Sequence, residues 1–233
     1  MQMILRWVGG IATAAIMLMI PPAPAQVFVD CNIGDSIQKA LDAQGEAAVA
    51  VVEFVGTCEE FISITRDRVS ISGVDDGATI VGRVRMFGPS NVTFRDFTIT
   101  GPEYGVMVRG GRTRLIGINL VGNEGVGVDG RDGATIRLAD GIVANNGGPH
   151  GVVLENAALA LIGSHVYGHP DLGIAVLGNS SLTADGSSVS DNLRGVFATL
   201  GSSVKAFNTD ITDNILDGIN MTTNSSAELD GVV

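Results

Sequence analysis

Three charged residues, Arg109, Asp129 and Glu155, each follow a short apolar segment and are predicted at the same position of successive repeats. Stacked one repeat apart, the two carboxylates would lie roughly 5 Å from each other, the spacing that retaining glycoside hydrolases use. Their mutual repulsion would favour one protonated carboxyl group, the state of a general acid, while Arg109 would keep Asp129 ionised. The pattern predicts a catalytic site, and a solvated ladder of surface charges is the simpler alternative.

Lengthened turns at residues 129–133 and 147–150 lie beside these charges, and such loops often carry function. His150 ends the second turn, and His169 occupies the corresponding turn of the next repeat. Both are candidates for ligand binding. With Asp171 they could converge on an ion, but a metal site needs three or more converging ligands. We therefore expect no resident metal or cofactor, and Ca²⁺ is the one ion that the acidic chain could attract.

Arginines mark a second candidate surface. Arg114 and Arg137 would stack on neighbouring repeats, with Arg95 nearby. Guanidinium groups at that spacing can each hold a carboxylate through two hydrogen bonds, as the acidic sugars of a polyuronate would require. Phe197 is expected to face outward, where its ring could stack on a sugar. Solubility alone also explains these arginines, because aspartates lie near enough in the sequence to neutralise them.

A repeat of about 22–23 residues must position all of these side chains. Its clearest marker is a polar turn residue that recurs at steps of 23, 23, 23 and 22 residues. The members of this ladder are Asn123, Asn146, His169, Asn192 and Asn214. Such a period is typical of a solenoid, in which each repeat buries its inner face against its neighbours. Stacked asparagines would bond one another and the adjacent backbone, with His169 as a substitute member.

Each repeat contains three short strands with alternating apolar residues. In the repeat that holds Asp129, the first strand is expected at residues 126–128, just before that carboxylate. From the third repeat on, a glycine precedes each first strand and is expected to have a left-handed backbone conformation. Residues 35–44 are predicted as a short helix, capped by Asp35, that covers the first rung. The prediction is an all-β parallel solenoid with a short N-terminal capping helix.

The ends of the chain carry their own signals. Residues 1–25 resemble a secretory signal, with Arg6, a short apolar run and an Ala-Pro-Ala sequence at its end. We expect residues 26–233 to form a single domain outside the cytoplasm (periplasmic, extracellular or on the cell surface), with no membrane-inserted segment. The last repeat stops before a third strand. Either the chain is part of a longer product, or its open rung associates with another molecule.

Composition narrows the class of partner. The chain has 25 acidic and 14 basic residues, a formal charge of −11, which disfavours nucleic acid and anionic membranes. Thirty-two glycines and 5% aromatic residues suit an all-β chain with many tight turns. Cys31 and Cys58 are the two cysteines, and an even count in a secreted chain predicts a disulfide between them.

From Cys31 onward the chain resembles the right-handed parallel β-helix proteins of the pectin-lyase-like superfamily. The resemblance includes the opening pattern at residues 37–41, the Gly-Thr-Cys-Glu-Glu segment at 56–60 and the run at 69–73. It implies a right-handed parallel β-helix with three strands per rung and an extracellular polysaccharide as the ligand. The catalytic motifs of the superfamily's polygalacturonases, alginate epimerases and pectate lyases do not occur as complete sets, so the resemblance assigns no activity.

Three functions therefore remain open. The favoured one is recognition of an extracellular polysaccharide, with polyuronates as the expected class, along the flat solenoid face. The second is a polysaccharide lyase or glycoside hydrolase that uses Asp129, Glu155 and Arg109. The third is a structural or adhesive surface protein. Incomplete catalytic motifs favour the first and third functions, whereas the lengthened turns favour the second.

Overall fold

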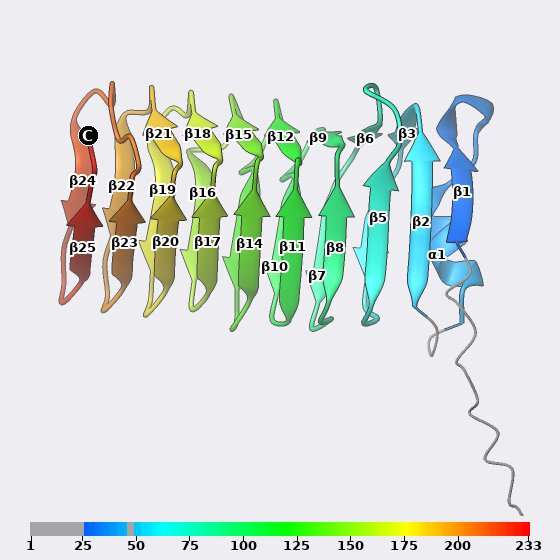
Figure 1. The fold of residues 1–233 in the computed structure, drawn as a ribbon, viewed down its shortest axis with the longest axis horizontal. Helices are drawn as coiled ribbons and strands as arrows, with labels where there is room; N and C mark the ends of the chain where they lie inside the picture. Colours follow the sequence, from blue (N-terminus) through cyan, green and yellow to red (C-terminus); the bar gives the residue numbers. More distant parts are fainter. Residues whose placement is uncertain (1–25, 46–48) are drawn as a thin grey trace, which may run out of the picture.

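The computed structural model describes residues 26–45 and 49–233, which wind into a parallel β-solenoid (Figure 1). From β2 to β22 each turn places one strand in each of three sheets, here called A, B and C in the order in which the chain visits them. Within each sheet, strands of successive turns pair in parallel. The predicted all-β solenoid with an N-terminal helix is confirmed.

The strands are short, as the pattern predicts. Sheet A contains β1 (Gln26–Asp30), β2 (Ala50–Val55), β5 (Val69–Gly73), β8 (Val92–Arg95), β11 (Arg112–Ile116), β14 (Thr135–Ala139), β17 (Ala158–Ile162), β20 (Ser181–Asp185), β23 (Ser203–Phe207) and β25 (Ser226–Asp230). Sheet B contains β3 (Thr57–Glu59), β6 (Thr79–Val81), β9 (Thr98–Thr100), β12 (Asn119–Val121), β15 (Ile142–Ala144), β18 (His165–Tyr167) and β21 (Ser188–Ser190). Sheet C contains β4 (Ile62–Ile64), β7 (Val84–Phe87), β10 (Val106–Arg109), β13 (Val128–Arg131), β16 (His150–Glu155), β19 (Leu172–Leu177), β22 (Arg194–Ala198) and β24 (Asp217–Met221).

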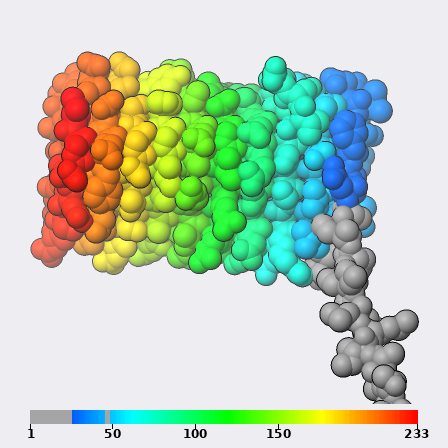
Figure 2. All heavy atoms as spheres, viewed as in Figure 1, coloured from blue at the N-terminus to red at the C-terminus, as the bar shows by residue number. Residues whose placement is uncertain are grey.

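The core lies inside the solenoid, between the three sheets. In strands such as β6, β7 and β11, side chains alternate between this interior and the solvent, so every second residue is buried. Val106, Val128 and Val152, for example, stack in register on successive strands of sheet C and are all fully buried. The rungs pack against one another as a continuous stack in the space-filling view (Figure 2).

The N-terminal end is covered by the short helix η1 (Cys31–Ile33) and by α1 (Ile37–Ala43). Ser36 caps α1 by accepting a hydrogen bond from the Lys39 amide, so the prediction that Asp35 caps it was wrong. Asp35 instead accepts a hydrogen bond at 3.2 Å from the Asp30 amide, which closes the turn before the helix. Both aspartate and serine suit an N-cap, and the sequence alone does not show whether Asp35 or Ser36 caps the helix.

A carboxylate from the first rung holds the start of α1. Glu60 accepts hydrogen bonds from the Ser36 hydroxyl at 2.7 Å, from the Ile37 amide at 2.7 Å and from the Gln38 amide at 3.1 Å. These donors would otherwise lack partners at the helix start. Glu60 therefore fixes the covering helix to the solenoid.

The predicted disulfide between Cys31 and Cys58 is present and joins η1 to β3, with the two Cα atoms 5.1 Å apart. The predicted secretory signal at residues 1–25 lies outside the described residues. In the part of the chain that the structure describes, no helix has the length and apolar character needed to span a membrane. Self-association through the last rung stays a prediction.

The predicted polar ladder is confirmed. The Asn146 side-chain oxygen accepts hydrogen bonds from the Asn123 backbone amide at 2.9 Å and from the Asn123 side-chain amide at 2.8 Å. Asn214 receives the same pair of bonds from Asn192, at 3.2 and 3.0 Å. The side-chain oxygen of each such member accepts hydrogen bonds from the buried amide groups of the member one rung earlier. These bonds connect successive rungs.

His169 replaces one asparagine and keeps the pattern. Its backbone amide and its Nδ1 atom lie 3.1 and 3.0 Å from the Asn192 oxygen, which can only accept, so Nδ1 carries the proton. Its Nε2 atom then accepts from the Asn146 side-chain amide at 3.3 Å. The side chain is 2% exposed, and burial lowers the pKa of His169 below its usual value. The ladder therefore requires the neutral ring.

The glycines at the start of the sheet C strands are needed because they lack a side chain, not because they adopt an unusual backbone conformation. In the rung of β13 this glycine is Gly127, not the predicted Gly125, because β13 begins at Val128. None of the glycines directly before β10 or β13, or in the corresponding places of later rungs, has a positive φ, so the predicted left-handed conformation was wrong. A Cβ atom at Gly151 would lie 2.5 Å from His169 Cε1, and one at Gly173 2.7 Å from Asn192 Nδ2. Only glycine leaves room for the ladder side chains.

We expect Asn192→Ala to lower the free energy of unfolding by about 1–3 kcal/mol, because it leaves the His169 amide and ring nitrogen without their acceptor. Chemical denaturation measures this loss. Asn119→Ala, on the partly exposed outer side of β12, is the matched control and should change stability far less. Equal effects of the two substitutions would contradict a structural role for the ladder.

The lowered pKa of His169 makes stability depend on pH. The folded state binds fewer protons at this ring than the unfolded state, so the stabilisation is complete above about pH 6.5 and is lost as the pH falls below it. His169→Asn should be neutral or stabilising at pH 7.5 and should remove this part of the acid sensitivity. Thermal melts of both proteins at pH 7.5 and 5 test it, and strong destabilisation at pH 7.5 would point to another role for the histidine.

Candidate functional site

The outer face of sheet C brings chemistry-bearing side chains into two straight columns. The first contains, in rung order, Ser63, Arg85, Met107, Asp129, Val153, Ala175, Phe197 and Asn220. The second contains Phe87, Arg109, Arg131, Glu155 and Leu177. Neighbouring rungs in parallel sheets lie about 4.8 Å apart, so each column presents one side chain per rung at that interval.

The columns correct the predicted alignment of Arg109, Asp129 and Glu155. Arg131, not Asp129, lies opposite Arg109 and Glu155, and Asp129 belongs to the other column. The prediction placed the strand two residues too early, because it preferred two valines at 126 and 128 as the inward pair. Gly130 takes the second inward position instead, facing Ile136 and Leu154. Arg131 was missed for the same reason.

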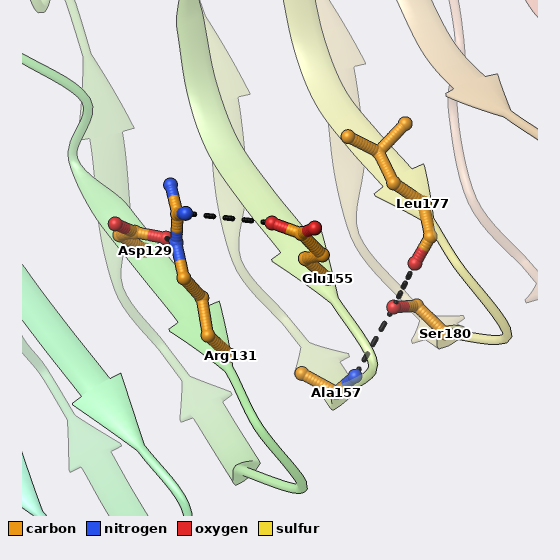
Figure 3. A network of polar contacts seen from close by, with 6 residues as sticks. All are labelled: Asp129, Arg131, Glu155, Ala157, Leu177 and Ser180. Carbon is orange, nitrogen blue, oxygen red and sulfur yellow. Dashed lines mark hydrogen bonds and ion pairs between the residues drawn. The ribbon is translucent and has the colours of Figure 1, made fainter.

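Asp129, Arg131 and Glu155 form a connected group, which we call the charged triad (Figure 3). Arg131 Nε donates to Asp129 Oδ1 at 2.7 Å, and Arg131 Nη1 lies 3.4 Å from Glu155 Oε2. Asp129 is only 5% exposed, and its hydrogen bond raises the pKa of Arg131 further above its usual value. The two carboxylates thus share one permanently charged guanidinium group rather than facing each other.

A second group lies on the earlier rungs of the same face. Three arginines and three aromatic rings make up this Arg–aromatic cluster: Phe61, Arg83, Arg85, Phe87, Tyr104 and Arg109. Arg85 lies between two rings, with its guanidinium carbon 4.5 Å from the centroid of Phe61 and 5.5 Å from that of Phe87. Arg109 lies 5.9 Å from the Phe87 ring. These distances are those of cation–π contacts.

Charge balance differs within the Arg–aromatic cluster. Arg83 is paired with Glu103, and a shallow hollow lined by Phe61, Gly82, Arg83, Pro102 and Glu103 opens beside it. Among the described residues, no ion pair involves Arg85 or Arg109, and the buried Nε of Arg85 has no hydrogen-bond partner. The sequence predicted that Arg109 would pair with Asp129. That prediction was wrong, because Asp129 pairs with Arg131 instead.

Charge is also segregated along the sequence. Residues 66–137 contain ten arginines and eight acidic residues, a formal charge of +2. Residues 138–233 contain two basic and ten acidic residues, a formal charge of −8. The middle rungs are thus the positive part of an acidic protein.

The later rungs of sheet C carry an outer apolar cluster: Val126, Val153, Leu172, Ala175, Leu177 and Phe197. Phe197 faces outward as predicted, but it packs on these neighbours instead of standing alone. The cluster is separate from the main core.

The two predicted histidines do not converge. His169 is buried in the ladder, whereas His150 Nδ1 lies 4.0 Å from Asp171 at the edge of sheet C. In the described ranges, the one group of His, Cys, Asp and Glu atoms close enough to hold a metal is Cys31, Cys58 and Glu60, and both of these cysteines are in the disulfide. Calcium binding stays a prediction without a site.

The predicted arginine line lies on a different face. Arg114 and Arg137 stack in register on β11 and β14 of sheet A, as predicted, and both are exposed. Arg95 lies opposite Ile116 and so belongs to a neighbouring column. Asp96 and Asp140 do not form ion pairs with these arginines in the described structure.

Comparisons with solved structures match the fold. The pectate lyase Pel9A superposes with a TM-score of 0.68 at 11% sequence identity, over 89% of this chain and 68% of that one. Full-length tailspike protein 2 of Escherichia coli O157:H7 bacteriophage CAB120 gives a TM-score of 0.51 at 17% identity, over 78% of this chain. The match covers 32% of that tailspike, about a third of its length. At these identities the likeness concerns the fold.

Sequence comparison gives the family. No curated protein matches the chain by sequence. The family model described as "Right handed beta helix region" matches residues 83–232, which is more than half of the chain. The resemblance inferred from the sequence is therefore confirmed, and the chain belongs to the right-handed β-helix family.

Proposed function

We propose that this protein binds an acidic extracellular polysaccharide on the outer face of sheet C. The observation that carries the proposal is the Arg–aromatic cluster. Arg85 and Arg109 lie on aromatic rings without a carboxylate partner among the described residues, in the positive segment of a chain with a charge of −11. Unpaired guanidinium groups held in place by rings are suited to receive carboxylates from a ligand.

The rings serve two purposes in this proposal. Phe61 and Phe87 hold the Arg85 guanidinium in a fixed direction, which reduces the entropy lost on binding. Phe87 is also 41% exposed, so its ring offers an apolar surface to a sugar. Acidic sugars present both a carboxylate and an apolar ring face, and the cluster matches both.

Two further observations support an extracellular polysaccharide. The similar solved structures include a pectate lyase and a phage tailspike. The disulfide between Cys31 and Cys58 is of a kind that persists in oxidising compartments, which agrees with the expected secretory signal. Secretion is part of this proposal.

A polysaccharide lyase or glycoside hydrolase is the second candidate, and the charged triad favours it. Asp129 and Glu155 lie next to the Arg–aromatic cluster, in line with Arg85 and Arg109. A ligand carboxylate that competes for Arg131 would release either carboxylate for acid–base work. Without a ligand, Arg131 holds both carboxylates, so we rank binding above catalysis.

The sheet A arginine line, with Arg114, Arg137 and Arg95, is the alternative binding surface. It lacks rings that would orient the guanidinium groups, since the described cation–π contacts are all on the sheet C side. A structural or adhesive role would require neither surface.

Arg85→Ala should weaken binding of a uronate oligosaccharide by about tenfold or more, because it removes a charge-assisted hydrogen bond. Isothermal titration calorimetry at fixed salt measures the change. Arg114→Ala removes an equally charged side chain from sheet A and should leave the affinity unchanged. If only Arg114→Ala weakens binding, the ligand lies on sheet A, and if no acidic glycan binds the proposal fails.

The catalytic alternative has its own test. We expect the wild-type protein to release neither reducing ends nor unsaturated products from the polysaccharides that it binds. Release that disappears in Asp129→Asn and Glu155→Gln, with unchanged melting temperatures, would instead establish an enzyme at the charged triad.

A further inference from the structure

The outer face of sheet C changes in chemical character along the solenoid axis. A single in-register column runs from Arg85 through Asp129 to Phe197. Five strand steps separate Arg85 from Phe197, a distance of about 24 Å at the usual spacing of parallel strands. The Arg–aromatic cluster occupies one end of this column, the charged triad its middle and the outer apolar cluster its other end.

The outer apolar cluster at this end is separate from the main core of the solenoid. Ala175 is fully buried, Leu172 is 7% exposed and Val153 is 9% exposed, although all three lie outside the solenoid interior. They are covered by one another and by the partly exposed Leu177 and Phe197. The apolar surface that this cluster offers to a ligand is therefore that of Leu177 and Phe197, together with the partly exposed Val126.

No free cation accompanies this patch among the described residues. Arg194, on the neighbouring strand, is held by Asp171 at 3.3 Å and by Asp217 at 3.4 Å. The segment from residue 138 onward carries a formal charge of −8. A ligand carboxylate placed here would lose hydration against apolar side chains and would meet a negative field.

We propose that the ligand is a charge-asymmetric glycan. Uronate sugars lie over the Arg–aromatic cluster, and uncharged sugars, whose carboxylates are absent or esterified, lie over the outer apolar cluster with an apolar ring face on Phe197. The column thus selects the pattern of charge along the glycan and fixes the direction in which it lies. This inference rests on the acidic-glycan binding proposed above and adds the chemistry of the other end.

The experiment compares three uronate oligosaccharides of equal length by isothermal titration calorimetry: the free acid, the fully methyl-esterified chain and a chain esterified over one half only. The half-esterified chain should bind wild-type protein about fivefold more tightly than the free acid. Phe197→Ser should abolish that preference by weakening binding of the half-esterified chain about fivefold, with a much smaller loss of affinity for the free acid. Phe207→Ser, which removes an outward phenylalanine from sheet A, should leave the preference intact.

Leu177→Asn, at the end of β19, is a second probe of the same patch and covers the case that Phe197→Ser does not fold. The inference is overturned if the free acid binds as tightly as the half-esterified chain, or if both patch substitutions leave the preference unchanged. Tight binding of the fully esterified chain also overturns it. Failure of the proposed function looks different, because then neither carboxylate-bearing chain binds and Arg85→Ala has no effect.

Discussion

Parallel, in-register pairing between successive rungs is the constraint on which the rest of this structure depends. Equivalent side chains of successive rungs stack above one another at the strand spacing, so they form columns along the solenoid axis. Inside the corner before sheet C, the column is polar and is built from asparagine and one neutral histidine. Gly151 and Gly173 are required beside it because any side chain there would collide with the ladder. The ladder therefore constrains both the register between successive rungs and the residue types that fit at the corner before sheet C.

The same constraint determines which charges meet on the outer surface. A shift of two residues in β13 keeps the same face outward, but each side chain then lies opposite a residue two positions away from the predicted one. With Val128 opposite Val106, Arg131 lies between Asp129 and Glu155 and binds both. The earlier rungs then present arginines on aromatic rings, and the later rungs present an apolar patch. The proposed function depends on the order of these groups along the two outer columns of sheet C.

Periodicity was sufficient to predict the solenoid, the polar ladder and the stacking of Arg114 on Arg137, because each depends on spacing alone. The disulfide followed from the cysteine count. The register of β13 could not be predicted from alternation, since Val126 and Val128 or Val128 and Gly130 fit the inward positions equally well. The Arg–aromatic cluster was also missed. Phe61 and Tyr104 lie just outside the strands, so no strand pattern brings them to Arg83.

The central claim is that an acidic glycan lies along the outer face of sheet C. A crystal structure of the protein with a bound uronate oligosaccharide tests it most directly. We expect density for the sugar chain along the outer columns that contain Arg85 and Arg109, with a carboxylate against one of these arginines. Density over Arg114 and Arg137 on sheet A, with the sheet C face empty, would contradict the account.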